Sequence, residues 1–104
     1  MGWGMAKTRS EIINDIEDYI RRQGGRFGEW YLGVTGAPKA TLFTRHKVKE
    51  KGDPWIARAA KDEYEARDIA EYFVGTVGCR GHLGKGAETE IYVYAFKILP
   101  TTKQ

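Results

Sequence analysis

The side chains best suited to chemistry lie close together in one short segment of the chain. Tyr31 and Thr35 fall in an expected strand, and Thr41, Arg45 and His46 fall in an expected helix just after it. A strand end beside a helix start brings polar groups to a place where a phosphate can bind. Hydrolysis of a phosphodiester needs a group that orients or deprotonates water and a cation that stabilises the developing charge. The residue types therefore indicate a phosphate site.

An alternative interpretation of the same residues needs no site. Tyr31 is then a strand tyrosine with a half-buried ring, and His46 is a histidine that the dipole favours at a helix end. Arg45 is then an ordinary solvated arginine.

The expected strand and helix follow from local patterns. Apolar residues at every second position predict a half-buried strand over residues 30–35. Gly36-Ala37-Pro38 ends that strand, and Pro38 suits the first turn of a helix because its φ is fixed and it has no N–H to lose. Apolar side chains at helical spacing then continue over residues 40–46.

This segment resembles the core motif of the GIY-YIG nuclease superfamily. Those proteins carry a strand ending in Tyr-Ile-Gly, a turn, and a helix with an arginine and a downstream histidine. Tyr31-Leu32-Gly33 corresponds to Tyr-Ile-Gly, and His46 falls at the histidine position. The resemblance covers residues 30–73. It implies a GIY-YIG-like fold in which tyrosines and the histidine handle protons, the arginine steadies the phosphate, and a glutamate holds a divalent metal.

Two positions depart from the family pattern. Thr41 stands where the arginine belongs, and Ala70 stands where the metal-binding glutamate belongs. Arg45 and Glu71 are the nearest replacements, although one residue turns a helix by about 100°. A site without its cation and metal ligand loses most of its rate. Mg²⁺ or Mn²⁺ is therefore implied only if the chain is an active nuclease that uses Arg45 and Glu71 in shifted roles.

The family's Gly-Ile-Tyr strand has no counterpart before Trp30. An aromatic segment at residues 90–98 is a candidate to take its place in a permuted order. Tyr92 or Tyr94 would then stand in for the missing tyrosine.

Basic residues form a second candidate feature. Positive charge is in excess between residues 39 and 51, and a basic, glycine-rich segment at residues 78–86 can add to it, including His82. Such a surface suits contact with phosphate backbones, and an ordinary solvated loop is the alternative. The candidate nucleic-acid contacts are Lys39, Lys47, Lys49, Lys51, Arg80 and Lys85.

The remaining patterns predict a single domain of 104 residues, with residues 1–7 and 100–104 as loose tails. Thr8 and Glu11 predict a capping box that starts a helix ending at Gly24-Gly25. Further predicted elements are a strand at 55–60, a helix starting after Asp62 and ending at Gly75 and Gly78, and a strand at 90–98 that is apolar on both faces and hence central. The expected class is α/β (α+β), a three-stranded sheet with three packed helices.

Composition excludes some classes of protein. Cys79 is the only cysteine, so no disulfide forms within the chain, which fits a cytoplasmic protein. Cys79 and His82 have a C-x-x-H spacing but too few companions for zinc, so we expect no metal site there. No segment approaches the length that spans a membrane, and we expect no membrane partner.

The sequence thus favours a divergent GIY-YIG-like domain that binds DNA or RNA, with weak or no nuclease activity. One alternative is a small protein–protein interaction or structural domain on the same scaffold, whose protein partner the sequence does not name. The other is an active metal-dependent endonuclease.

Overall fold

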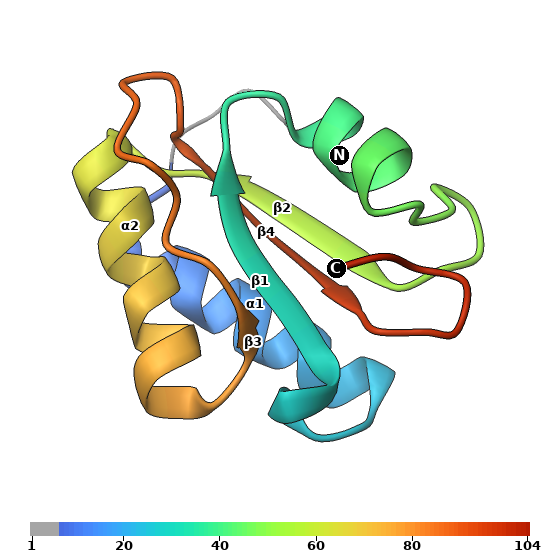
Figure 1. Cartoon of the computed structure of the whole chain (residues 1–104). Helices are drawn as coiled ribbons and strands as arrows, with labels where there is room; N and C mark the ends of the chain where they lie inside the picture. Colours follow the sequence, from blue (N-terminus) through green and yellow to red (C-terminus); the bar gives the residue numbers. More distant parts are fainter. Residues whose placement is uncertain (1–6) are drawn as a thin grey trace.

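The computed structural model describes residues 7–104 and has a four-stranded mixed sheet with helices on both faces (Figure 1). The strands are β1 (Trp30–Thr35), β2 (Trp55–Ala59), β3 (Arg80–Gly81) and β4 (Tyr92–Lys97). The α-helices are α1 (Arg9–Gln23) and α2 (Glu63–Glu71). Ala40–Arg45 and Tyr72–Val77 are short π-helices. A short 3-10 helix, Phe27–Glu29, leads into β1. The predicted α/β class is confirmed.

The strand order is β2-β4-β1-β3, so the last strand in the sequence is central. β4 pairs antiparallel with β1 and with β2, which confirms that the first and last predicted strands are neighbours. β3 pairs parallel to β1, with Arg80 opposite Tyr31 and Gly81 opposite Leu32. The predicted count of three strands was one short, because β3 is only two residues long and lies in a segment without a strand pattern.

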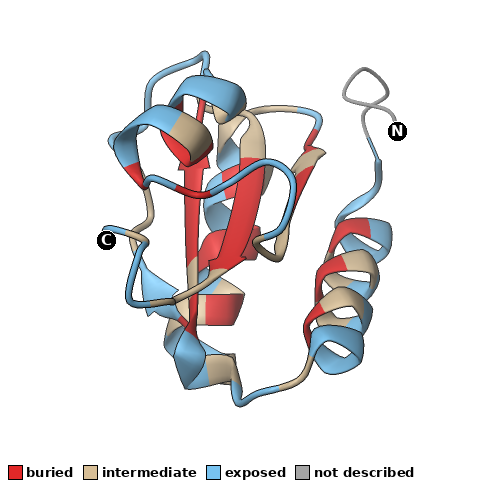
Figure 2. Ribbon diagram, turned by 90° about the vertical axis from the view of Figure 1, so that its right-hand side faces the viewer, coloured by how far each residue is buried: buried red, intermediate tan, exposed pale blue. Residues whose placement is uncertain are grey.

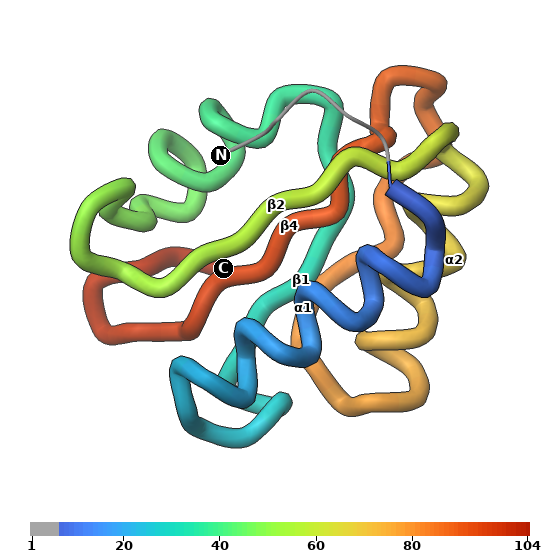
Figure 3. The backbone as a smooth tube through the Cα atoms, turned by 180° about the vertical axis from the view of Figure 1, so that it is seen from behind, coloured from blue at the N-terminus to red at the C-terminus, as the bar shows by residue number. Residues whose placement is uncertain are grey.

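The helices divide between the two faces of the sheet. α1 and α2 cover one face, as the view from behind shows (Figure 3). On that face Ile16, Trp30 and Phe73 join one apolar cluster. The helix Ala40–Arg45 covers the other face, where Leu42 packs with Phe96 in a second cluster. β1 is consequently buried on both faces rather than half buried as predicted, and Figure 2 shows the inner strands in the buried colour.

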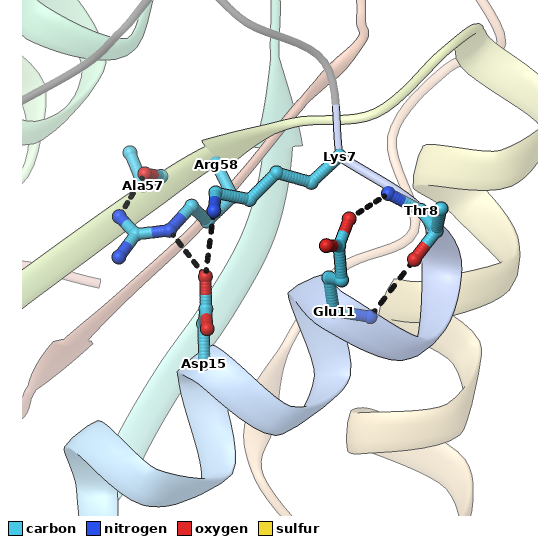
Figure 4. Close-up of polar contacts among 6 residues, drawn as sticks. All are labelled: Lys7, Thr8, Glu11, Asp15, Ala57 and Arg58. Carbon is cyan, nitrogen blue, oxygen red and sulfur yellow. Dashed lines mark hydrogen bonds and ion pairs between the residues drawn. The ribbon is translucent and has the colours of Figure 1, made fainter.

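α1 begins as its sequence predicts. The Glu11 N–H donates to Thr8 Oγ1 at 3.2 Å, and the Thr8 N–H donates to Glu11 Oε1 at 2.9 Å (Figure 4). One turn later, Asp15 accepts from Arg58 Nε on β2 at 2.9 Å and lies 3.7 Å from Lys7 Nζ. The Asp15–Arg58 pair links α1 to β2, and a partly exposed pair of this kind contributes little to stability.

The helix that begins after Asp62 was expected to end at Gly75 and Gly78, and it ends at the second of these glycines. Asp62 Oδ1 accepts the Glu65 N–H at 2.8 Å, which confirms the predicted cap. The chain remains helical through Gly75, contrary to the prediction, and stops at Gly78 with φ of 102°. A glycine ends a helix when it adopts a left-handed conformation, and only Gly78 does so here.

Two predicted boundaries are shorter in the structure. β2 ends at Ala59 rather than Ala60, and β4 runs from Tyr92 to Lys97 rather than from 90 to 98. Residues 100–104 were expected to be loose, but the Lys103 N–H donates to the His46 carbonyl at 2.7 Å. Of the other expected tail, residues 1–6 lie outside the described residues, and the Lys7 N–H donates to the Ala59 carbonyl at 3.0 Å.

Between residues 7 and 104, no helix is both long and apolar enough to cross a membrane.

Two glycine substitutions should have opposite effects on the free energy of unfolding. A Cβ at Gly81 would collide with the Leu32 carbonyl, and φ there is 144°. Gly81→Ala should therefore lower the free energy of unfolding by about 1–3 kcal/mol or more. Gly75→Ala meets no atom within 4 Å at an exposed helical position, and should raise it by about 0.5–1 kcal/mol. Urea unfolding of both variants checks this, and equal effects would contradict it.

Candidate functional site

A pocket of about 410 Å³ opens on the sheet face covered by the helix Ala40–Arg45. Its lining comes from β1, that helix, the segment after β3, β4 and the C-terminal end of the chain. The lining residues are Tyr31, Val34, Thr35, Thr41, Arg45, His46, His82, Gly84, Lys85, Glu90, Tyr94 and Gln104.

The floor of the pocket is polar but buried. Tyr94 is fully buried, and Thr35, Thr41 and His46 are 9%, 6% and 6% exposed. Thr35 Oγ1 and Thr41 Oγ1 hydrogen-bond to each other at 2.7 Å. The rim is more open, because Arg45 and Lys85 are exposed.

A chain of hydrogen bonds crosses the floor and joins two histidines through one tyrosine. Tyr94 Oη lies 2.8 Å from His46 Nε2 and 3.2 Å from His82 Nε2. His46 Nδ1 lies 2.6 Å from the Lys103 carbonyl oxygen, and the Gly84 N–H donates to His82 Nδ1 at 3.0 Å. Segments far apart in the sequence therefore meet at a single hydroxyl group.

The backbone groups at the two ends fix the direction of this chain. A carbonyl only accepts, so His46 Nδ1 carries a proton, and in the neutral ring its Nε2 then accepts from the Tyr94 hydroxyl. A backbone N–H only donates, so His82 Nδ1 is unprotonated and its Nε2–H donates to Tyr94 Oη. With both histidines neutral, each is in one tautomer, and every link has one donor and one acceptor.

The electrostatics of the pocket favour the neutral histidines. Burial lowers the pKa of His46 and of His82, and the nearby Arg45 lowers both pKa values further. Two influences act the other way: the Lys103 carbonyl raises the pKa of His46, and Glu90 raises that of His82. Burial also raises the pKa of Tyr94, so its hydroxyl keeps its proton.

Gly33 makes room for this arrangement. A Cβ at Gly33 would lie 2.5 Å from His82 Nε2 and 2.7 Å from Tyr94 Oη. The glycine of the Tyr-Leu-Gly segment therefore leaves the space in which the histidine and the tyrosine meet.

Three residues of the pocket lining carry a donor group that has no acceptor among the described residues. These groups are the guanidinium of Arg45, the ammonium of Lys85 and the hydroxyl of Tyr31. The carboxylate in the lining, Glu90, is already engaged, because its Oε1 accepts N–H groups of Lys85, Gly86 and Ala87 at 2.9, 2.9 and 3.1 Å. The pocket thus offers unpaired donors and positive charge, which suit an anion.

The structure brings three of the four predicted catalytic residues to this pocket. Tyr31, Arg45 and His46 line it, and the rings of Tyr31 and His46 lie 4.8 Å apart. Glu71 is exposed on α2, whose buried residues pack on the opposite face of the sheet, and no residue of α2 lines the pocket. Ala70 is fully buried in that opposite cluster.

The predicted nucleic-acid contacts are distributed more widely. Lys85 lines the pocket, whereas Lys39 lines a separate shallow depression beside Tyr92. The others are exposed and lie outside the pocket lining: Lys47, Lys49, Lys51 and Arg80.

β4 lies beside β1, and of its two tyrosines it is Tyr94 rather than Tyr92 that lines the pocket.

The roles of His82 and Glu90 were not predicted from the sequence. His82 entered only as an addition to a basic loop and as half of a C-x-x-H spacing. Its neighbouring glycines are the available signal: Gly81 lets the backbone approach β1, and Gly84 supplies the N–H that orients the ring.

Metal ligands do not gather within residues 7–104: no group of three or more His, Cys, Asp and Glu side chains there is arranged to hold an ion. Cys79 packs in the cluster of α1 and α2, and burial raises the pKa of its thiol to about 12. His82 faces the pocket instead, so the C-x-x-H spacing does not bring these two side chains to one site.

Comparison of the chain with protein-family models, with curated proteins and with solved structures finds no match.

The buried histidines predict a pH dependence of stability. Folding lowers both pKa values below their ordinary value of 6.5, so the unfolded chain takes up protons that the folded chain resists. The two histidines therefore leave stability intact above pH 6.5, and stability falls as the pH drops below it. Urea unfolding from about pH 7.5 to about pH 5.5 measures the effect.

The matched control is the double variant His46→Gln/His82→Gln, which should show a flatter profile over that range. Wild-type and variant profiles of equal slope would contradict this prediction.

Proposed function

We propose that this chain is a nucleic-acid-binding domain whose pocket receives a phosphate. The observation that carries the proposal is the convergence of Arg45, Lys85 and the Tyr31 hydroxyl on one pocket, where none of them has an acceptor among the described residues. Phosphate oxygens accept hydrogen bonds from all three donor types. The polar floor beneath them already satisfies its own hydrogen bonds, so these rim groups are the ones that remain for a ligand.

Exposed basic residues outside the pocket extend this surface in the proposal. Backbone phosphates repeat along a nucleic acid, so a pocket that holds one phosphate gains from cations that meet its neighbours. The residues proposed for these outer contacts are Lys39, Lys47, Lys49, Lys51 and Arg80. Such contacts are independent of sequence, and both DNA and RNA carry the required phosphates.

The proposed domain is a divergent, permuted relative of the GIY-YIG nucleases that binds with weak or no cleavage. Support for the relationship comes from Tyr31, His46 and Tyr94, which share one pocket although they come from three different elements. Support for weak cleavage comes from Thr41, whose hydroxyl is buried against Thr35, and from Ala70, which packs in the core. Neither side chain supplies the charge or the metal ligand that the family uses at these positions.

Binding should depend on the pocket cations. Arg45→Ala and Lys85→Ala together should weaken binding of a labelled 20-residue oligonucleotide at least about tenfold at low salt and flatten the salt dependence. Arg67→Ala is the matched control, because Arg67 is an exposed arginine on α2, which covers the opposite face. Fluorescence anisotropy over a salt series measures both. No binding of DNA or RNA at low salt, or equal losses in the control, would contradict the proposal.

Cleavage should be slow or absent with either divalent metal. Wild-type protein incubated with labelled DNA or RNA and Mg²⁺ or Mn²⁺ should give little product on a denaturing gel, because Thr41 offers no charge to a phosphate. Glu71→Ala should leave any residual rate unchanged, since Glu71 does not line the pocket. Rapid metal-dependent cleavage that disappears in Glu71→Ala would instead establish the chain as an active nuclease.

A further inference from the structure

The pocket is walled on several sides by segments that are themselves held in place. The helix Ala40–Arg45 lies on one side of β1 and the segment that follows β3 lies on the other (Figure 1). Gln104 adds a further wall, and the residue before it is tied to His46 by hydrogen bonds of 2.7 and 2.6 Å. The three N–H groups that donate to Glu90 tie down the segment after β3.

The base of the pocket is closed. Tyr94 and His46 are 0% and 6% exposed, and β1 and β4 pair directly beneath them. Walls around a buried floor form a recess, whereas a strand of nucleic acid that continues in both directions needs a groove open at both ends. A phosphate at the end of a strand has the chain on one side only and can enter a recess end-on.

The charges at the rim agree with this shape. Arg45 and Lys85 are two cations that make no ion pair within residues 7–104, and the Glu90 carboxylate beside them is engaged with backbone N–H groups. A phosphodiester carries one negative charge, whereas a terminal phosphate monoester carries about 1.5–2 near neutral pH. The Glu90 carboxylate keeps its negative charge, so the number of donors favours the monoester: two unpaired cations and the Tyr31 hydroxyl suit its three free oxygens better than the two free oxygens of a diester. A volume of about 410 Å³ is within the range of pockets that take small ligands, so it suits a terminal phosphate and its sugar.

We infer that this pocket recognises the phosphorylated end of a nucleic-acid strand, a terminal phosphate monoester, in preference to an internal phosphodiester. The inference rests on the proposed function and names the ligand group of the same pocket. Arg45 and Lys85 bind the terminal phosphate, the Tyr31 hydroxyl donates to it, and the exposed lysines outside meet the following internal phosphates.

The test compares single strands of one sequence that differ only in their ends. The probes carry a 5′-phosphate, a 3′-phosphate or hydroxyl groups at both ends, and a covalently closed circle of the same sequence supplies internal phosphates alone. Each competes with a labelled 5′-phosphorylated strand for the full chain in fluorescence anisotropy. We expect at least one of the two phosphorylated strands to compete about tenfold better than the hydroxyl-ended strand or the circle. The stronger competitor of the two shows whether the 5′- or the 3′-phosphate is recognised.

Two variants test whether the preference for a phosphorylated end arises in this pocket. Lys85→Ala removes an exposed side chain that bonds no described residue, so the variant should fold, and the ratio between its affinities for the phosphorylated strand and for the circle should fall to near one. Arg67→Ala should retain the preference. Equal competition by all four probes, with binding still dependent on Arg45, would overturn this inference and leave the proposed function standing. Absence of binding by every probe would overturn both.

Discussion

Burial of β4 on both faces is the constraint on which the rest of this structure depends. Val93 and Ala95 join the cluster under α1 and α2, while Tyr94 and Phe96 join the cluster under the opposite helix. Fully burying each large apolar side chain contributes about 1.5–3 kcal/mol, so this one strand stabilises both layers. Its tyrosine also needs a partner for its hydroxyl, and the two histidines satisfy that need. The polar floor of the pocket is thus a product of core packing.

Most of the fold was predictable because its signals are local or compositional. The capping box of α1 lies within four residues, and the central position of β4 follows from an absence of alternation. β3 was not predictable, because it forms by the approach of the Gly81 backbone to β1 and leaves no periodic pattern of side chains. The helix end expected at Gly75 was wrong for a related reason, because the conformation of a glycine, and not its residue type, decides whether a helix stops there.

The candidate site was predictable only in its local part. Tyr31, Arg45 and His46 come from one strand-turn-helix unit, so their proximity follows from short-range geometry. Tyr94 bonds to a histidine 48 positions away, and such a pairing is fixed only by the assembled sheet. His82 and Glu90 likewise enter through a loop whose course depends on β3. A single sequence carries little information on such contacts between distant residues, apart from the glycines that leave room for them.

The central place of the last strand has a consequence for biosynthesis. Within residues 7–104, β2 has no sheet partner other than β4, and β1 is joined to β2 only through it. On the ribosome, these earlier strands must wait for residues 92–97 to emerge before either apolar layer can close. Contacts between distant parts of a chain form slowly and leave apolar surface exposed meanwhile. A nascent chain that stalls before Lys97 therefore presents unpaired strand edges, the kind of surface that chaperones bind.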